Sequence, residues 1–322
     1  MKISDEVKDA KTIAISGHVR PDGDCIGSVM GLYLYLTKVL PDTQIDIYLE
    51  KPADIFNCIR NIDKIKSDCK TDIRYDAFFA MDCNAERLGF AETIYEKAGK
   101  RINIDHHISN QGCGDINILD PESSSTCELL YGLLDEEQVD EEIAKALYIG
   151  IIHDTGVFKY SNTSPKTLCL AAKLIAFGFD FPKLIDETFY EKTYVQSQIM
   201  GRAILESVRF LDGRCIVSMV SRKTMDFYQA GPKDLDGIVN QLRIVKGVEC
   251  AIFMYEIAPM EYKVSMRSNG NVDVAAIAVL FGGGGHVRAA GCTMKCTYHD
   301  AINNLSVHIE EQLKAHGRMK KH

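Results

Sequence analysis

The residues best suited to chemistry stand in four short segments of the first half of the chain. The first segment, residues 17–28 (GHVRPDGDCIGS), places one histidine and two aspartates within seven residues. In chain order, the candidates are His18, Asp22 and Asp24; Asp82; Asp105, His106 and His107; and His153 and Asp154. Carboxylates and imidazoles without thiolates suit a hard or borderline cation such as Mn²⁺ or Mg²⁺ better than structural zinc. Two such cations about 3.5–4 Å apart would activate water and hold a phosphoryl group for in-line attack.

These residues fall at the ends of predicted strands and helices. Strands are predicted over 12–16, 45–49, 75–81 and 101–104, and helices over 26–39, 125–134, 141–152 and 166–177. We expect Pro21, Gly23 and Gly27 to keep the first segment a loop. Apolar strands that alternate with helices predict an α/β fold, a mostly parallel sheet with helices on both faces. Functional residues of such sheets gather beyond the carboxyl ends of the strands.

The pattern changes after residue 185. A polar helical stretch over 186–201 is predicted to link a catalytic domain, 1–185, to a smaller α/β domain, 202–322. In the second domain three β-rich runs of hairpin character, 214–220, 248–257 and 262–267, precede a helix over 274–280. A glycine run and a final helix over 300–314 follow.

Composition narrows the classes of function. The 322 residues are 46% hydrophobic and 25% charged, which is typical of a folded chain of about two domains. The net charge is −8, divided as −10 over residues 1–185 and +2 over 186–322. This balance argues against a sequence-blind binder of long nucleic acid, which needs excess positive charge. An acidic first half suits metal cations instead.

The cysteines and the apolar runs bear on location. Eleven cysteines, none arranged as CxxC, are expected to be reduced thiols rather than a disulfide framework. No signal peptide is visible at the start, and the apolar runs are too short to span a bilayer. We therefore expect a cytoplasmic protein without a membrane partner.

Taken together, the motifs resemble those of a known family. Residues 18–28 (HVRPDGDCIGS), the strand end at Asp82, DHH at 105–107 and HDTGVFKYSNT at 153–163 resemble the four motifs of the DHH phosphoesterase superfamily. MRS at 266–268, VDV at 272–274 and FGGGGH at 281–286, followed by AAG at 289–291, resemble its DHHA1 domain. This pairing is similar to the bacterial bifunctional oligoribonuclease/pAp phosphatases, or nanoRNases. Arg20 is a local variation at a position that need not touch metal.

The resemblance implies a role for each motif residue. Two Mn²⁺ ions are implied as cofactors, with Mg²⁺ or Co²⁺ left open. His107 would face the substrate phosphate as a stabiliser or acid near the leaving oxygen, and Asp105 would orient the histidines. The implied metal ligands are His18 and Asp22 for one ion, Asp24, His106 and Asp154 for the other, and Asp82 as the bridge.

In the second domain the resemblance implies substrate binding. The implied residues are Arg267, Ser268, Gly283, Gly284, Gly285 and His286. Glycines let backbone N–H groups approach a phosphate, a histidine can stack on a base, and an arginine offers a planar fork to phosphate. A glycine run can also be a plain structural loop.

The function implied is metal-dependent hydrolysis of short oligoribonucleotides (nanoRNA) and of 3′-phosphoadenosine 5′-phosphate (pAp). Alternatives are a phosphodiesterase for linear or cyclic dinucleotides such as pApA and c-di-AMP, and an inorganic pyrophosphatase or exopolyphosphatase. An inactive nucleotide sensor would require a lost ligand, and all six implied ligands are present. Short RNA and phosphorylated nucleotides are the expected partners, rather than long duplexes, and a homodimer stays open.

Two features near the motifs are interpreted as structural. The serine-rich run at 123–126 is predicted to start a helix, with Ser125 and Glu128 as a capping box. His153, beside Asp154, is predicted to pack or to support the neighbouring ligand rather than to bind metal itself.

Overall fold

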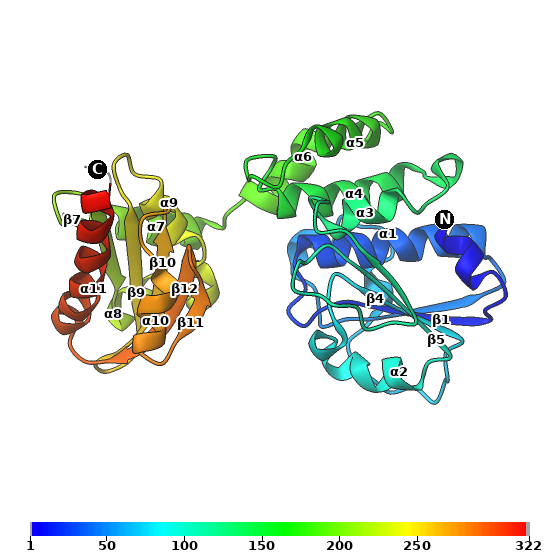
Figure 1. Ribbon diagram of the computed structural model, residues 1–322, viewed down its shortest axis with the longest axis horizontal. Coiled ribbons are helices and arrows are strands. Elements are labelled where there is room, and N and C mark those ends of the chain that lie inside the picture. Colours follow the sequence, from blue (N-terminus) through cyan, green and yellow to red (C-terminus); the bar gives the residue numbers. More distant parts are fainter. Residues whose placement is uncertain (1, 320–322) are drawn as a thin grey trace. The chain divides into compact units, whose positions relative to one another are not determined.

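The computed structural model describes residues 2–319, and the side chains of residues 2–315. The chain divides into two compact units between Glu191 and Lys192, here called unit 1 and unit 2 (Figure 1). Each unit has its own sheet and its own apolar core.

Unit 1 is built on a six-stranded parallel sheet with the strand order β3-β2-β1-β4-β5-β6. The central strand β4 is buried along its whole length, as expected for a strand covered on both faces. The strands are β1 (Thr12–Ser16), β2 (Gln44–Tyr48), β3 (Ile65–Lys66), β4 (Ala77–Met81), β5 (Lys100–Asp105) and β6 (Ile116–Leu119).

Helices cover both faces of this sheet. In Figure 1, α1, α3 and α4 lie on one face and α2 lies on the other. Each face has a separate apolar cluster, and β4 supplies Phe79 to one and Phe78 to the other. The helices are α1 (Gly23–Val39), α2 (Glu92–Lys97), α3 (Thr126–Tyr131), α4 (Glu141–Asp154), α5 (Pro165–Ile175) and α6 (Phe181–Ile185).

Helix α1 begins earlier than predicted, so the expected loop over 17–28 ends at Asp22. The Asp22 side chain caps the helix, because its Oδ1 accepts hydrogen bonds from the backbone N–H groups of Asp24 and Cys25. Gly27 belongs to the helix because α1 lies tightly against α4. A Cβ atom at Gly27 would lie 2.6 Å from the carbonyl oxygen of Ala146. Packing between helices therefore outweighs the low helix propensity of glycine.

The single linker helix predicted over 186–201 is replaced by two helices. A π-helical turn, Asp186–Tyr190, continues from α6, and α7 (Tyr194–Leu205) starts anew. Thr193 and Gln196 form a capping box, in which each side chain accepts the backbone N–H of the other residue. The boundary between the units falls inside the predicted linker, and α7 packs within unit 2.

Unit 2 also has a six-stranded sheet, with the order β11-β12-β10-β9-β8-β7. All neighbouring pairs are antiparallel except β8 and β9, which are parallel because two helices connect them. The first two of the three β-rich runs therefore do not form a hairpin with each other, whereas the second and third, β9 and β10, do. The strands are β7 (Val208–Phe210), β8 (Cys215–Val220), β9 (Cys250–Ala258), β10 (Glu261–Ser268), β11 (Gly284–His286) and β12 (Ala289–Lys295).

The helices of unit 2 cover both faces of its sheet. Helices α7, α8 and α9 pack on one face, and α10 and α11 pack on the other. Their bounds are α8 (Arg222–Tyr228), α9 (Ile238–Arg243), α10 (Val274–Leu280) and α11 (Tyr298–Met319). The predicted fold class, a mostly parallel α/β domain followed by a smaller α/β domain, is confirmed.

Two global expectations can be compared with the structure. All eleven cysteines are unpaired. Within residues 2–319, no helix combines the length and the apolar character needed to cross a membrane.

Candidate metal centre

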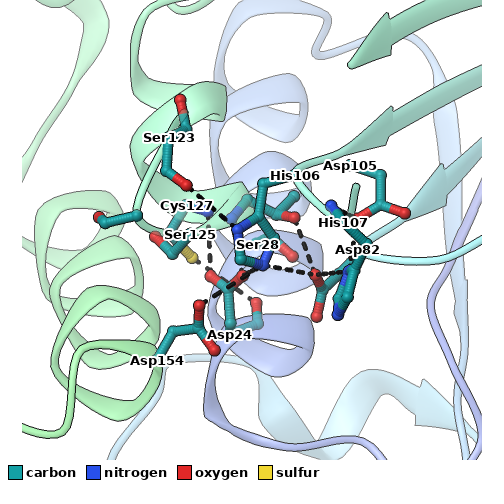
Figure 2. A network of polar contacts seen from close by, with 12 residues as sticks. Asp24, Ser28, Asp82, Asp105, His106, His107, Ser123, Ser125, Cys127 and Asp154 are labelled. Carbon is teal, nitrogen blue, oxygen red and sulfur yellow. Dashed lines mark hydrogen bonds and ion pairs between the residues drawn. The ribbon is translucent and has the colours of Figure 1, made fainter. Parts of the chain in front are cut away.

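The four predicted segments meet at one end of unit 1. β1, β4 and β5 are adjacent parallel strands, and His18, Asp82 and Asp105 follow or end them. Asp154 ends α4, which packs over the same sheet. Parallel strands that end together bring residues distant in sequence to one point, and Figure 2 shows the side chains of Asp24, Asp82, His106 and Asp154 turned toward one another.

Asp82 lies at the centre of the cluster. Its backbone has φ of +58°, a left-handed conformation that aspartate tolerates better than most residues, and its N–H donates to the carbonyl of Ile104. The carboxylate is 2% exposed. Its Oδ2 lies 3.5 Å from Nε2 of His18, and its Oδ1 lies 3.8 Å from Nε2 of His106. Asp82 therefore lies within reach of groups on both sides, as a bridging ligand requires.

His18 is oriented toward two carboxylates. Its Nδ1 is 2.9 Å from the carbonyl oxygen of Val19, so this nitrogen donates and Nε2 is left as a ligand atom. Nε2 lies 3.6 Å from Oδ1 of Asp22, besides its approach to Asp82. Although burial lowers the pKa of His18, hydrogen bonds with Asp22 and Asp82 raise it to about 10. A positive charge is therefore favoured between these carboxylates.

A second group of donors comprises Asp24, His106 and Asp154. Nε2 of His106 is 3.4 Å from Oδ2 of Asp154 and 3.9 Å from Oδ2 of Asp24. Nδ1 of His106 faces the carbonyl of Ser123 at 3.2 Å, which leaves Nε2 for a ligand. Ligand atoms from these three residues all lie within 4.8 Å of one another. Two donors about 2.1 Å from one ion lie about 3–3.5 Å apart, which is the spacing of His106 and Asp154, while Asp24 at 3.9 Å lies slightly farther from His106.

The electrostatics of this group also fit a cation. Burial and the neighbouring carboxylates of Asp82 and Asp154 raise the pKa of Asp24 well above its usual range. Burial, together with Asp82 and Asp22, raises the pKa of Asp154 to about 6 although His106 opposes the shift. Carboxylates crowded in this way repel one another unless positive charge lies among them. The donor set therefore suits divalent ions held by oxygen and imidazole nitrogen.

His107 is held differently from His106. Its Nδ1 is 2.7 Å from Oδ1 of Asp105, which also accepts the backbone N–H of His107. The other oxygen of Asp105 accepts from the side-chain amide of Asn110 at 2.6 Å. Asp105 thus orients His107, whereas His106 is oriented by Ser123. His107 is 41% exposed on its side chain and is open to an approaching molecule.

The serine-rich run contributes more to the centre than the sequence suggested. Thr126 donates its N–H to Oδ2 of Asp24 at 2.7 Å and its hydroxyl to Oδ1 of Asp82 at 2.9 Å. Ser125 caps α3 as predicted, but the Glu128 side chain bonds Ser124 instead of closing a capping box. In the sequence, a run of small hydroxyl residues before a helix predicts the helix cap at Ser125. It does not predict that Thr126 contacts Asp24 and Asp82.

Two further residues lie beside the centre. Cys25 places its sulfur within 4.8 Å of ligand atoms of His18 and Asp82, and burial raises the pKa of this thiol well above its usual value. A protonated thiol is a weak metal ligand. The ring of His153 packs between those of Phe56 and Phe189, with centroids 5.3 and 5.4 Å away. The predicted packing role of His153 is confirmed.

In unit 2, the predicted substrate residues come together at one end of β10. Arg267 is half-buried and its guanidinium donates to the carbonyl of Met266 at 3.0 Å. Ser268 is 1% exposed, and its hydroxyl accepts backbone N–H groups of Gly270 and Val272. In the strand register, Arg267 pairs with Ala289, which in turn pairs with His286. His286 is exposed.

The glycine run forms the end of α10 and an edge strand rather than a loop. The N–H groups of Gly282 and Gly283 donate to carbonyls of α10 and end that helix. Gly284–His286 then forms β11, the edge strand beside β12. Gly285 has φ of +145°, and a Cβ atom there would lie 2.5 Å from the carbonyl oxygen of Ala289. A Cβ atom at Gly284 would meet nothing within 4 Å.

Comparison with known proteins shows similarity along most of the chain. Residues 12–151 match the model of the DHH family, N-terminal domain, and residues 212–315 match the DHHA1 domain. The chain is 32% identical to the bifunctional oligoribonuclease and PAP phosphatase NrnA of Thermus thermophilus over 286 residues, 88% of this chain and 84% of that protein. It is 26% identical to the protein of the same name in Bacillus subtilis, over 95% of this chain and 96% of that one.

A solved structure is similar over nearly the whole length of the chain. The crystal structure of an exopolyphosphatase-related protein from Bacteroides fragilis superposes with a TM-score of 0.84 at 25% identity. It covers 96% of this chain and 94% of its own.

Proposed function

The chain belongs to the DHH family of phosphoesterases, and on this premise we propose that it hydrolyses short oligoribonucleotides and pAp. The observation that supports the chemistry is the position of Asp82, whose carboxylate lies within 4 Å of nitrogens of His18, His106 and His107. The names of the relatives from T. thermophilus and B. subtilis support the choice of substrates.

Two divalent ions, with Mn²⁺ as the proposed metal, would provide an activated water and neutralise the charge of the phosphoryl group. His18 and Asp22 would hold one ion. Asp24, His106 and Asp154 would hold the other, and Asp82 would bridge them. The crowded carboxylates support bound cations. The distances support this division, because Nε2 of His18 approaches Asp22 while Nε2 of His106 approaches Asp24 and Asp154.

His107 is proposed to contact the phosphoryl group. Its Nδ1 donates to Asp105, which fixes the ring and favours a charged imidazole, because the Asp105 hydrogen bond raises the pKa of His107 although burial opposes it. A charged imidazole can stabilise the phosphoryl oxygens and give a proton to the leaving oxygen. Asp105 is the residue that orients it.

Unit 2 is proposed to bind the nucleotide. Arg267 would pair with a phosphate, and the exposed His286 would stack on a base. Gly283, Gly284 and Gly285 would let the backbone approach the ligand closely, and the buried Ser268 would shape the turn after β10. A cytoplasmic location is proposed because it suits both the unpaired thiols and RNA fragments as substrates.

A product assay tests the proposal. The purified protein is incubated with pAp, pApA, a trinucleotide, inorganic pyrophosphate and tripolyphosphate, each with Mn²⁺ or with EDTA. We expect phosphate release from pAp and mononucleotides from the trinucleotide, with no turnover in EDTA. Turnover restricted to pyrophosphate or tripolyphosphate would contradict the proposed substrates. Turnover of pApA alone would show that the protein is a dinucleotide phosphodiesterase instead.

A further inference from the structure

A buried carboxylate stands in the first turn of α3, next to the turn that contacts the metal centre. Glu128 is 2% exposed, and its Oε2 accepts the hydroxyl of Ser124 at 2.5 Å and the hydroxyl of Thr167 at 2.7 Å. Nζ of Lys166 is 3.2 Å from Oε1. Although burial raises the pKa of Glu128, the hydrogen bonds from Ser124 and Thr167 and the Lys166 charge hold it below its usual value. Glu128 is thus a buried anion in unit 1 that the proposed chemistry leaves without a role.

Ser124 lies in the turn that supports the proposed ligands. The preceding carbonyl, that of Ser123, accepts from Nδ1 of His106 at 3.2 Å. Two residues after Ser124, Thr126 donates to both Asp24 and Asp82. A shift of this turn would therefore change the orientation of three proposed ligands together.

The turn is also linked to a further proposed ligand, Asp154, through the side-chain amide of Asn162. Nδ2 of Asn162 donates to the carbonyl of Ser124 at 2.9 Å and also to the carbonyl of Asp154 at 3.2 Å. The same nitrogen lies 3.5 Å from the Asp154 carboxylate. Residues 123–126 consequently contact Asp24, Asp82 and His106 directly, and Asp154 through Asn162. Figure 2 labels Ser123 and Ser125 of this turn beside Asp24, Asp82, His106 and Asp154.

We propose that Glu128 is a positioning residue of the metal centre, which acts by holding Ser124 and thereby the turn 123–126 that orients Asp24, Asp82 and His106. This inference rests on the proposed function only in requiring that these residues bind metal. Groups that orient metal ligands commonly change metal affinity about 10- to 100-fold when they are removed. Glu128 could also have a purely structural role, in which it joins α3 to α5 through Thr167. Experiment must separate this role from the positioning role.

Four variants separate the two roles. Glu128→Gln and Ser124→Ala weaken or remove the bond to the turn, whereas Thr167→Val removes the bond to α5 and leaves Ser124 in place. Asp46→Asn is the matched control, because the Asp46 carboxylate also accepts hydrogen bonds from a hydroxyl and an ammonium group. These are the hydroxyl of Tyr75 at 2.6 Å and Nζ of Lys66 at 2.7 Å. It lies on β2, toward the edge of the sheet away from β5.

The measurement is Mn²⁺ binding without any nucleotide, by calorimetry and by the electron paramagnetic resonance of bound Mn²⁺. We expect Glu128→Gln and Ser124→Ala to weaken at least one Mn²⁺ site about tenfold or more and to alter its spectrum. Thr167→Val and Asp46→Asn should lower the melting temperature while both sites keep their affinity.

The outcomes are distinguishable. If Glu128→Gln and Ser124→Ala bind two Mn²⁺ ions with unchanged affinity, or if Thr167→Val weakens binding equally, Glu128 is only a structural link and the inference is overturned. If Glu128→Gln does not fold, Ser124→Ala decides alone. Because no substrate is present, failure of the wild-type protein to cleave RNA would overturn the proposed substrates and leave this result standing.

Discussion

The proposed metal centre of unit 1 and the glycine-rich edge of unit 2 use their residues in opposite ways. At the proposed metal centre, ionisable side chains that follow β1, β4 and β5 converge with others on α1 and α4, and hydrogen bonds to the backbone orient several of them. At the glycine-rich edge, the backbone conformation is possible only because glycine has no Cβ atom, as at Gly285 beside Ala289. A site made of ionisable side chains is tested by changing charge, and a site made of backbone is tested by adding a Cβ atom.

The largest expected effect is at the centre of unit 1. Asp82→Asn removes the negative charge but keeps a residue that tolerates the left-handed backbone at φ +58°. We expect turnover of pAp to fall below detection and at least one Mn²⁺ to be lost, with little change in the free energy of unfolding of the metal-free protein. Metal analysis, circular dichroism and the product assay measure these quantities. Asp82→Ala should add backbone strain of about 1 kcal/mol. An Asp82→Asn enzyme that remained active with two bound ions would contradict the bridging role of Asp82.

His107 tests whether one side chain in this cluster acts on substrate instead of metal. His107→Ala should retain both Mn²⁺ ions and lose roughly 10²- to 10⁴-fold in kcat, the range for a positioned acid or base. His106→Ala is the matched comparison, because it should lose metal as well as rate. If the His107 variant loses metal instead, the cluster of Asp82, His106 and His107 binds the ion and the two histidines exchange roles.

In unit 2, the expected effect is smaller and selective. Arg267→Ala or His286→Ala should raise KM for pAp and dinucleotides about tenfold, the cost of one charge-assisted or stacking contact. Activity on bis-p-nitrophenyl phosphate should change little, whereas the Asp82 variant should lose both substrates alike. Steady-state kinetics on the two substrates make the comparison. Equal losses on both from the unit 2 variants would mean that this region supports the active site without recognising nucleotides.

The smallest effects separate two neighbouring glycines. Gly285→Ala should lower the free energy of unfolding by about 1–3 kcal/mol, because its φ of +145° disfavours a side chain and the Cβ would contact Ala289. Gly284→Ala should stay within about 0.5 kcal/mol of wild type. Urea denaturation measures both. A raised KM in Gly284→Ala without lost stability would show that ligand, and not folding, requires a bare backbone there.

The sequence by itself determined much of unit 1. The order of strands and helices and the choice of candidate ligands follow from local patterns, because apolar periodicity and strand-end carboxylates depend on near neighbours in the chain. His18, Asp82 and His106 could be singled out in this way, as could the packing of His153. The family resemblance of the motifs added the division of the candidates between two ions.

Tertiary structure decided which partner each residue meets. Gly27 lies within α1 because α4 is so close that a Cβ atom there would meet the carbonyl oxygen of Ala146. The serine-rich turn reaches Asp24 and Asp82 across long stretches of sequence, and the glycine run becomes an edge strand only because β12 lies beside it. The contacts of Gly27 and of the serine-rich turn join residues distant in the chain, so local pattern carries no signal for them; they arise only when the sheets and helices pack.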